Sequence, residues 1–506
     1  MSQVLQALSR HACARPHASA LVGDSLTLSY GALEREVQAA ARRLTEGGFR
    51  RIGLLMDNGP GWAVADLAAR QAGALLVPLP PFFSDAQIDH VATDTGLDVV
   101  LTDMPSRVAR LFDGGTIKPL PQLGGSDVWA LRTAPVRHRD LPPHTAKVTY
   151  TSGTTGSPKG VCLSQAAQDR VASSLATLME VQAHDVHLAL QPLGVLLENI
   201  AGLDVSLLRG VACTLPPLAR VGIRGAAGVD AAALVAAIAD RRASSVILVP
   251  ETLRALVAAV ESGAGLPSLR FAAVGGAPLS PVLVERAWEL GLPAYEGYGL
   301  SECASVVAVN TPGARRLGSV GRPLPHARLR IAPDGEILIA GTLFEGYVGE
   351  RPRGLDKGFW ASGDIGRLDD DGFLHVTGRK KHLYITAFGR NVSPEWAERE
   401  LNAHPAIAQA VVFGEGRPWG SAVVVPRAAA SAEEVDRAIT ALNGGLPDYA
   451  RIGRWVAADE PFSPHNRLLT STGRPRREAI WHRYGERIDE FYRSATERDG
   501  AGNGIL

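Results

Sequence analysis

The chain has 506 residues, 46% hydrophobic and 21% charged, which is typical of a globular protein with two or more domains. Its 52 basic and 52 acidic residues cancel, which argues against recruitment to nucleic acid or to an anionic membrane by overall charge. The four scattered cysteines argue against a disulfide framework or structural zinc, and without an apolar leader or a bilayer-long apolar run we expect a soluble, cytoplasmic protein.

The first half of the chain alternates helical and strand-like patterns. Residues 29–48 have apolar spacing near 3.6 and end in glycines, which predicts a helix, and "RIGLLMDN" (51–58) follows as a short buried strand. Farther on, a helix precedes the strand "SVILVP" (245–250), and residues 269–291 give a strand, a glycine turn and a helix. This alternation predicts parallel sheets covered by helices.

From about Leu329 the pattern changes. "LRIAPDGEILIAG" (329–341) and "GRLDDDGFLHVTGRKK" (366–381) each place Asp-Gly between strand-like runs, which predicts hairpins. A compact tail follows, with a helix in 393–404, a strand in 408–414 and a helix near 431–443. We place a domain boundary near Gly378–Lys381, which divides the chain into residues 1–378 and 379–506.

A short strand-like run leads into a glycine-rich loop in "KVTYTSGTTGSPKG" (147–160). Successive backbone N–H groups, hydroxyls and a lysine in such a loop suit a polyphosphate. The loop is not a Walker A sequence, because Lys159 follows a proline. Taken alone, this composition is more often that of a mobile surface loop.

The whole string from Thr151 to Gly160 resembles the signature loop of the adenylate-forming (ANL) superfamily of AMP-forming acyl-CoA synthetases, luciferases and peptide-synthetase adenylation domains. Other segments resemble further motifs in the family's order: "GGAPLS" (275–280), "YEGYGLSE" (295–302), "GSVGRPLP" (318–325), "WASGDIG" (360–366) and "GRKKHLYITAFGRNVSP" (378–394). The resemblance implies an α/β fold. Its large N-terminal adenylation domain would have two αβ layers and a distorted β-barrel, and a small mobile α+β domain would follow a hinge near Lys381.

The resemblance also implies the reaction. A carboxylic acid and ATP, with Mg²⁺, would give an acyl-adenylate and pyrophosphate, and the thiol of CoA would then take the acyl group. A carrier protein's phosphopantetheine, or another nucleophile in a specialised biosynthetic pathway, is the alternative acceptor. A non-catalytic nucleotide-binding regulator is disfavoured, because Glu302, Asp364, Arg379 and the loop hydroxyls are all present. We expect neither nucleic acid nor a transmembrane segment among the interactions.

The family pattern assigns roles to individual residues. Glu302 would hold Mg²⁺, Asp364 would accept hydrogen bonds from the ribose hydroxyls, and Tyr298 would face the adenine. The expected catalytic residues are Thr151, Glu302, Lys381 and Arg474. The other expected nucleotide-binding residues are Ser152, Gly153, Thr154, Thr155, Gly156, Lys159, Gly275, Gly276, Ala277, Glu296, Gly297, Tyr298, Gly299, Ser301, Asp364 and Arg379.

The first departure from the family pattern lies in "TSTGRPRREAI" (470–480), where Arg474 stands at the position of the lysine in "PTGKxxR". Arginine keeps the charge but presents it as a planar fork. Three interpretations stay open: Arg474 performs the lysine's role, Arg476 or another nearby cation substitutes, or adenylation is slow. We favour the first.

The second departure lies in "LQPLGVLLENIAG" (190–202), where relatives usually have histidine or an aromatic residue in place of Val195. No aspartate stands there to bind an α-ammonium group, which disfavours an α-amino acid. The apolar run suits a fatty or other apolar acyl group, although core packing explains it equally well. The expected substrate-binding residues are Val195, Asn199 and Gly276, with a helix cap as the alternative for Asn199. "ITAFGRNVSPEW" (385–396) resembles bacterial long-chain acyl-CoA synthetases and points to a fatty acid.

Overall fold

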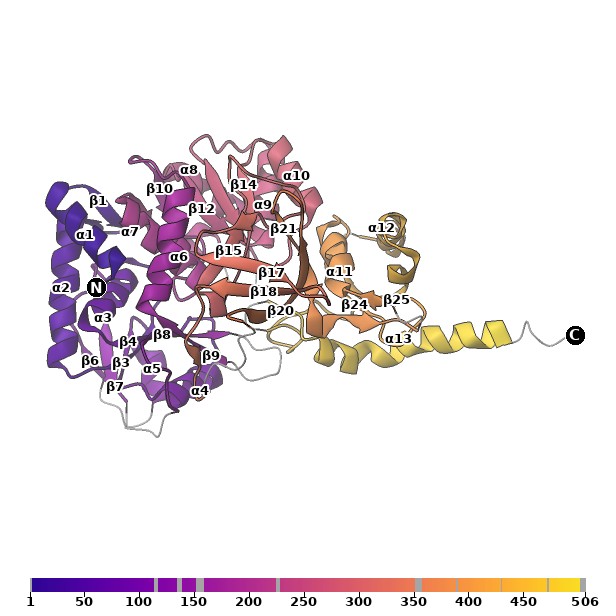
Figure 1. Ribbon diagram of the computed structural model, residues 1–506, viewed down its shortest axis with the longest axis horizontal. Helices are drawn as coiled ribbons and strands as arrows, with labels where there is room; N and C mark the ends of the chain where they lie inside the picture. The colour runs from indigo at the N-terminus through magenta and orange to yellow at the C-terminus, as the bar shows by residue number, and fades with distance from the viewer. Residues whose placement is uncertain are drawn as a thin grey trace, which may run out of the picture.

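The computed structural model describes residues 2–112, 117–133, 139–151, 159–223, 228–350, 357–387, 390–428, 430–470 and 473–500. A large N-terminal domain contains two large sheets and a smaller one, and a small C-terminal domain lies beside it (Figure 1). The expected α/β fold with a large and a small domain is confirmed.

The first large sheet has nine strands. Its central strands, from β14 to β1, are parallel, and antiparallel strands lie at both ends. In spatial order the strands are β16 (Arg322–Pro323), β15 (Ser305–Val309), β14 (Ala294–Leu300), β13 (Phe271–Val274), β12 (Ser245–Leu248), β10 (Val186–Leu188), β11 (Ala212–Thr214), β1 (Ser19–Val22) and β2 (Thr27–Ser29).

The second large sheet has eight strands, and its centre is again parallel, from β8 to β5. In spatial order the strands are β19 (Gly346–Tyr347), β9 (Lys159–Ser164), β8 (Thr145–Thr151), β4 (Leu75–Pro78), β3 (Arg51–Leu55), β5 (Val99–Thr102), β7 (Trp129–Arg132) and β6 (Ile117–Pro119). β3 is the short buried strand expected at 51–58.

Helices pack on both faces of each large sheet. The cores between the two sheets include α1 (Gln3–Ala14), α2 (Tyr30–Glu46), α3 (Pro60–Ala72), α6 (Gln165–Leu178), a π-helix (Leu197–Asp204) and α7 (Val205–Arg209). The outer face of the nine-stranded sheet is covered by α8 (Ala231–Asp240), α9 (Pro250–Glu261) and α10 (Pro281–Glu289). The outer face of the eight-stranded sheet is covered by α4 (Asp85–Thr95) and α5 (Pro105–Leu111). These are the two αβ layers that the sequence predicted.

Local signals explain where the predicted helices begin. The Ser29 hydroxyl accepts a hydrogen bond from the Ala32 N–H, which fixes the start of α2, and Asp230 caps α8 in the same way. The helix expected over 29–48 therefore forms within two residues of its predicted bounds.

A four-stranded antiparallel sheet corresponds to the expected barrel. It contains β17 (Ala327–Ile331), β18 (Glu336–Gly341), β20 (Trp360–Leu368) and β21 (Leu374–Arg379), and both predicted Asp-Gly hairpins are present. Its apolar face packs against the β14–β15 end of the nine-stranded sheet. The loops of this sheet therefore reach the carboxyl end of β14.

The small domain has a three-stranded sheet with helices on both faces. It contains β22 (Tyr384–Ile385), β23 (Asn391–Val392), α11 (Pro394–Ala403), β24 (Ile407–Phe413), β25 (Gly420–Pro426), α12 (Ala432–Gly445), β26 (Ile452–Ala457) and α13 (Arg477–Gly500). α11 and α12 pack on one face and α13 on the other, and α13 extends beyond the rest of the molecule (Figure 1). The predicted strand and two helices are present, whereas β25, β26 and α13 were not predicted.

A cluster of buried charges ties the inner helices to the eight-stranded sheet. Lys147 of β8 contacts Asp66 of α3, with 2.7 Å between Nζ and Oδ1. Arg70 contacts Asp66 at 2.6 Å and Asp204, at the end of the π-helix, at 2.9 Å. Burial alone would raise the pKa of Asp66, but Arg70 and Lys147 lower it, so this carboxylate stays ionised. Two cations and two carboxylates therefore hold β8, α3 and the π-helix together.

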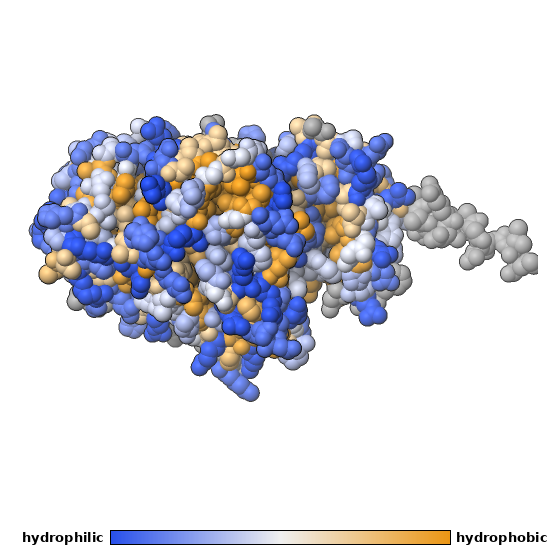
Figure 2. All heavy atoms as spheres, turned by 90° about the horizontal axis from the view of Figure 1, so that it is seen from above, coloured by the Kyte–Doolittle hydropathy of each residue, from blue (hydrophilic) through white to orange (hydrophobic). Residues whose placement is uncertain are grey.

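The surface has a mixed character. On the face seen in Figure 2, hydrophilic residues interrupt the hydrophobic ones over both domains. Among the residues that the structure describes, no helix combines the length and the apolar character needed to cross a membrane.

Removing one member of the buried cluster should destabilise the large domain. We expect Lys147→Met to lower the free energy of unfolding by about 3–5 kcal/mol, because it leaves a buried carboxylate without its partner. Urea unfolding followed by circular dichroism measures the change. Lys118→Met, on the exposed part of β6, is the matched control and should leave the transition unchanged. Equal stability of both variants would contradict the role given to the cluster.

Candidate active site

Glycine backbones from two neighbouring strands meet at one edge of the nine-stranded sheet. Gly275 and Gly276 follow β13, and a Cβ on Gly275 would lie only 3.4 Å from the carbonyl oxygen of Gly297 in β14. Gly276 has φ +83°, which a residue with a side chain rarely adopts. At Gly299 a Cβ would lie 1.8 Å from the carbonyl oxygen of Ser305, so only glycine fits. Residues without a side chain therefore let the backbone segments come this close at the carboxyl ends of β13 and β14.

Asp364 of β20 joins this edge to the four-stranded sheet. The Tyr298 hydroxyl donates to its Oδ2 at 2.6 Å, and Arg379 contacts its Oδ1 at 2.7 Å. Asp364 and Arg379 are also direct cross-strand partners. Desolvation raises the pKa of Asp364, and Arg379 opposes the rise. A buried carboxylate is thus held at the carboxyl end of β14.

Glu302 lies just beyond the end of β14. Its Oε1 accepts a hydrogen bond from the Tyr347 hydroxyl at 2.8 Å, and the Lys159 ammonium lies 5.1 Å from the centre of the Tyr347 ring. Ala304 and Ser305 follow with φ +56° and +113°, an uncommon conformation for residues other than glycine. Such strain is found at functional sites. The backbone turn fixes where the Glu302 carboxylate points.

Two cations of the small domain, Lys381 and Arg474, come within electrostatic reach of Asp364. The Arg474 guanidinium donates to the carbonyl oxygen of Gly276 at 3.4 Å. Desolvation and then the charge of Arg379 lower its pKa, while Asp364 and Glu302 act in the opposite direction. The pKa of Lys381 is likewise lowered, by desolvation and then by Arg379 and Arg474. The charges of Arg379, Arg474 and Lys381 are therefore close enough to influence one another.

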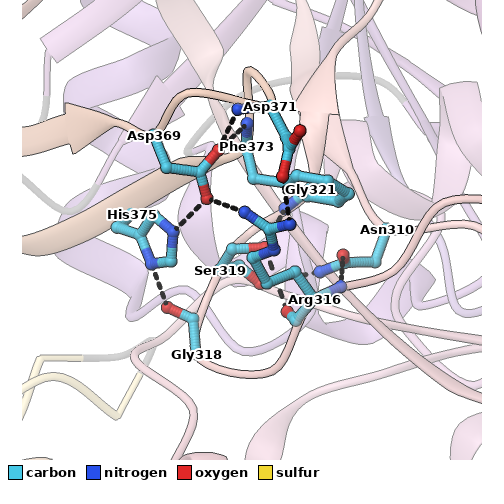
Figure 3. Close-up of polar contacts among 9 residues, drawn as sticks. All are labelled: Asn310, Arg316, Gly318, Ser319, Gly321, Asp369, Asp371, Phe373 and His375. Carbon is cyan, nitrogen blue, oxygen red and sulfur yellow. Dashed lines mark hydrogen bonds and ion pairs between the residues drawn. The ribbon is translucent and has the colours of Figure 1, made fainter.

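A polar cluster supports the site from behind. The Arg316 guanidinium lies between Asp369 and Asp371, at 2.6 and 2.5 Å, and the His375 ring bridges Asp369 and the carbonyl oxygen of Gly318 (Figure 3). These contacts fasten the segment "GSVGRPLP" to the β20–β21 hairpin. The hairpin in turn carries Asp364 and Arg379, so the cluster sets their position.

The half-buried Glu296 lies on β14, directly before Gly297. Burial raises the pKa of its carboxyl to about 8, and the charge of Arg399 from α11 opposes the shift. At neutral pH this carboxyl is therefore mostly protonated and is a hydrogen-bond donor as well as an acceptor.

The predicted substrate-binding residues lie in two different environments. Val195 and Leu197 are half-buried, and Leu197 lies next to Gly275. Asn199 is 1% exposed, and its side-chain oxygen accepts a hydrogen bond from Lys147 at 2.5 Å inside the buried charge cluster. The side-chain oxygen of Asn199 therefore serves a buried lysine that requires an acceptor, and the contact of Asn199 with substrate stays a prediction.

Part of the predicted phosphate loop is not described. Ser152, Gly153, Thr154, Thr155 and Gly156 lie outside the described residues, as does the side chain of Thr151. Thr151 and Lys159 are cross-strand partners at the ends of β8 and β9, so the two ends of the loop lie together. Within the described ranges, no group of three or more His, Cys, Asp or Glu residues is arranged to hold a metal.

Two participants were missed in the sequence. Tyr347 lies 45 residues from Glu302, and no local pattern connects them. Lys147 is the one charged residue of β8, which was a usable sign of a buried partner, but the sequence did not identify Asp66 as that partner.

Comparisons with known proteins agree with this geometry. Residues 8–348 match the family of AMP-binding enzymes, and residues 382–496 match the C-terminal domain of AMP-binding enzymes. The chain belongs to the AMP-binding enzyme family. The predicted superfamily and the predicted enzyme class, an AMP-forming acid–CoA ligase, are confirmed.

Individual relatives of this family have different acids in their names. The chain is 30% identical to feruloyl-CoA synthase of an Amycolatopsis species over 82% of this chain and 87% of that protein. It is 34% identical to long-chain-fatty-acid–CoA ligase FadD15 of Mycobacterium tuberculosis over 44% of this chain, which is 42% of that protein. A similar solved structure is that of O-succinylbenzoate coenzyme A synthetase from Bacillus subtilis in complex with ATP and magnesium ion. It has a TM-score of 0.75 at 22% identity, and the match covers 93% of this chain and 98% of that chain. This similarity shows the shared fold.

The raised pKa of Glu296 gives a pH-dependent stability. Folding raises this pKa from 4.5 to about 8, so ionisation of the carboxyl across that range destabilises the folded state. Glutamine cannot ionise. We expect the melting temperature of Glu296→Gln to exceed that of the unchanged protein by a margin that grows between about pH 5 and pH 8 and then levels off. Calorimetry in a pH series measures this, with exposed Glu285→Gln as the control. A margin independent of pH would contradict the assignment.

Proposed function

We propose that the protein uses ATP to convert an apolar carboxylic acid into an acyl-adenylate, with release of pyrophosphate, and then transfers the acyl group to the thiol of CoA. The observation that carries the proposal is the position of Arg474. This cation of the small domain contacts Gly276 and lies within electrostatic reach of Asp364 and Glu302 of the large domain. Membership in the AMP-binding enzyme family supports the same reaction.

The first step needs positive charge where two anions meet. A carboxylate oxygen attacks the α-phosphorus of ATP, the bond to the bridging oxygen breaks, and pyrophosphate leaves with the electron pair. Negative charge grows on the α-phosphate and on the leaving group, so cations fixed in advance lower the barrier. Arg474, Arg379 and Lys381 are the cations that the site offers, and the lowered pKa values of Arg474 and Lys381 support a place made for an anion.

The nucleotide would lie along the glycine edge. Each oxygen of Asp364 has two lone pairs, and its contacts with Tyr298 and Arg379 occupy one position on each oxygen, which leaves capacity to accept the ribose hydroxyls. The Tyr298 hydroxyl is fixed by Asp364, so its ring is held in one orientation for the adenine. Gly275, Gly276 and Ala277 would pass close to the base on the other side.

The phosphates would lie between Glu302 and the glycine-rich loop. The loop hydroxyls and backbone N–H groups, with Lys159, are the proposed ligands of the β- and γ-phosphates. Glu302 offers one hard carboxylate, and Mg²⁺ usually takes one or two carboxylates together with substrate phosphates, so the residues fit this ion. When bound, Mg²⁺ supplies Lewis acidity at the phosphates. The hydrogen bond from Tyr347 orients the Glu302 carboxylate for that task.

The acid would enter over an apolar wall. Val195 and Leu197, together with Gly276, form the proposed contact surface for the acyl group. The names of the relatives include both a long-chain fatty acid and the aromatic feruloyl group. Both acids are largely apolar, which supports an apolar acid as the substrate class. No aspartate stands in this segment to hold an α-ammonium group.

The small domain would turn about Lys381 between the two steps. Lys380 is bound to Asp334 and Glu336 of the large domain, at 2.7 Å each, whereas the next residue but one, His382, is bound to Glu395 of α11. Lys381 is thus the residue between two anchored neighbours, which supports a hinge there and a boundary between residues 1–378 and 379–506. Rotation of the small domain about Lys381 would move Arg474 away from the site and turn another face of the small domain toward it.

The reaction is tested by ATP–pyrophosphate exchange with octanoate, palmitate, ferulate, benzoate and phenylalanine. We expect exchange with at least one of the four apolar acids and not with phenylalanine. Addition of CoA should then yield the acyl-CoA and AMP, whereas a holo-carrier protein should not accept the acyl group. Tight binding of AMP without exchange for any acid would show a regulator instead.

Arg474 should be required for adenylation. We expect Arg474→Ala to slow exchange by at least about tenfold, equivalent to about 1.4 kcal/mol of transition-state stabilisation, because the α-phosphate loses its mobile cation. Arg476→Ala, two residues away and exposed, is the matched control and should exchange at the unchanged rate. A slow Arg476→Ala with a normal Arg474→Ala would transfer the role to Arg476.

A further inference from the structure

The last turn of α11 contacts the large domain at several points outside the candidate site. The Ser280 hydroxyl donates to Oε2 of Glu400 at 3.2 Å, and Arg254 of α9 donates to the carbonyl oxygen of Ala403 at 3.3 Å. Arg399 donates to the other oxygen of Glu400 at 3.1 Å and exerts its charge on Glu296 of β14. Both ends of this turn are therefore held by the large domain.

The contact of Ser280 with Glu400 replaces an ordinary helix cap. Ser280 is the N-cap residue of α10, a position where serine usually accepts a hydrogen bond from the helix's own N–H groups. Here its side chain makes no such bond and is directed to the small domain, although Ser280 is only 4% exposed. The Glu400 carboxylate thereby lies at the N-terminus of a nine-residue helix, where the helix dipole favours a negative charge.

The contact at Ala403 places a positive charge at the C-terminus of a helix, where the helix dipole favours a cation. Ala403 is the last residue of α11, and its carbonyl oxygen belongs to the negative end of that helix. The Arg254 guanidinium supplies a cation there. The two contacts match opposite charges at two helix ends, so they favour one docked arrangement of the small domain.

These contacts act on the same loop as Arg474. Gly276, which Arg474 contacts, and Ser280, which Glu400 contacts, are four residues apart in "GGAPLS". A small domain anchored at Ser280 therefore brings Arg474 to Gly276, and a small domain released from Ser280 withdraws it.

We propose that the hydrogen bond between Ser280 and Glu400, supported by Arg254, is a latch that selects the domain arrangement for adenylation. The inference rests on the proposed function, since it assigns the latch to one of its two half-reactions. Glu400, Ser280 and Arg254 are positioning residues: they act on the reaction through the placement of Arg474. The second half-reaction, in which the CoA sulfur attacks the acyl carbon and AMP leaves, does not need the latch.

The half-reactions separate this role from general damage to the fold. We expect Glu400→Ala and Ser280→Ala each to lower ATP–pyrophosphate exchange on the order of tenfold, the effect typical of a lost charge-assisted hydrogen bond. Thioester formation from CoA and the synthetic acyl-adenylate of the acid that gives the fastest exchange should keep its rate. The double variant should be no slower than either single variant, because both remove one interaction. Glu433→Ala, exposed in α12, is the matched control. Equal losses in both half-reactions, or none in either, would overturn the proposal.

A distance measurement tests the latch without any acid. Spin labels on Glu285→Cys in α10 and Arg437→Cys in α12, in a Cys13→Ser background, report the separation of the domains in the presence of ATP and Mg²⁺. We expect one dominant distance in the labelled protein and in Glu433→Ala, and a broad distribution in Glu400→Ala and Ser280→Ala. An unchanged distribution in the latter two would overturn the latch even if the proposed reaction holds. Absence of exchange in the unmutated enzyme with a normal response of the distances would instead overturn the reaction.

Discussion

Two cations and two carboxylates buried between the large sheets constrain everything around them. Lys147, Asp66, Arg70 and Asp204 must stay in contact, because an unpaired charge in an apolar interior is strongly destabilising. The elements that carry them are thereby held in one relative position. β8 leads into the glycine-rich loop, and the π-helix begins at Leu197, beside Gly275. One buried cluster therefore fixes the separation between the proposed phosphate end and the proposed acyl end of the site.

The elements that could be predicted from the sequence are those with local signals. Ser29 and the following glycines bound a helix within twenty residues, and each Asp-Gly pair lies between the strands it joins. Glu302 and Asp364 could be proposed as site residues because each lies in a short motif of its own. The contacts of these side chains could not be predicted, since Tyr347 reaches Glu302, and Tyr298 reaches Asp364, only once separate sheets have packed together. The contact of Asn199 could not be predicted for the same reason: a polar residue in an apolar run can serve a ligand or a buried charge, and Lys147 lies 52 residues away in the sequence.

The candidate site has more positive charge than its own carboxylates offset. Arg379 is paired with Asp364, but its charge also acts on Arg474 and Lys381. Desolvation together with this repulsion lowers the pKa of both Arg474 and Lys381. In the proposed reaction an anion between them would relieve the repulsion, so we expect binding of a polyphosphate and approach of the small domain to support one another. The planar guanidinium of Arg474 reaches a backbone carbonyl of the loop while keeping further N–H donors for a phosphate, which a lysine ammonium on a flexible stem would do with less fixed geometry.

The π-helix from Leu197 to Asp204 has a consequence for comparing this enzyme with its relatives. Its hydrogen bonds join residues five apart instead of four, so each turn holds more residues than an α-helical turn does. Side chains on either side of such a segment change their angular position relative to a helix that is α throughout. An alignment of sequences that runs straight through this segment can therefore pair a residue that faces the acid in one protein with a residue that faces the core in another. Acid preference in this part of the family follows from superposed backbones more directly than from aligned letters.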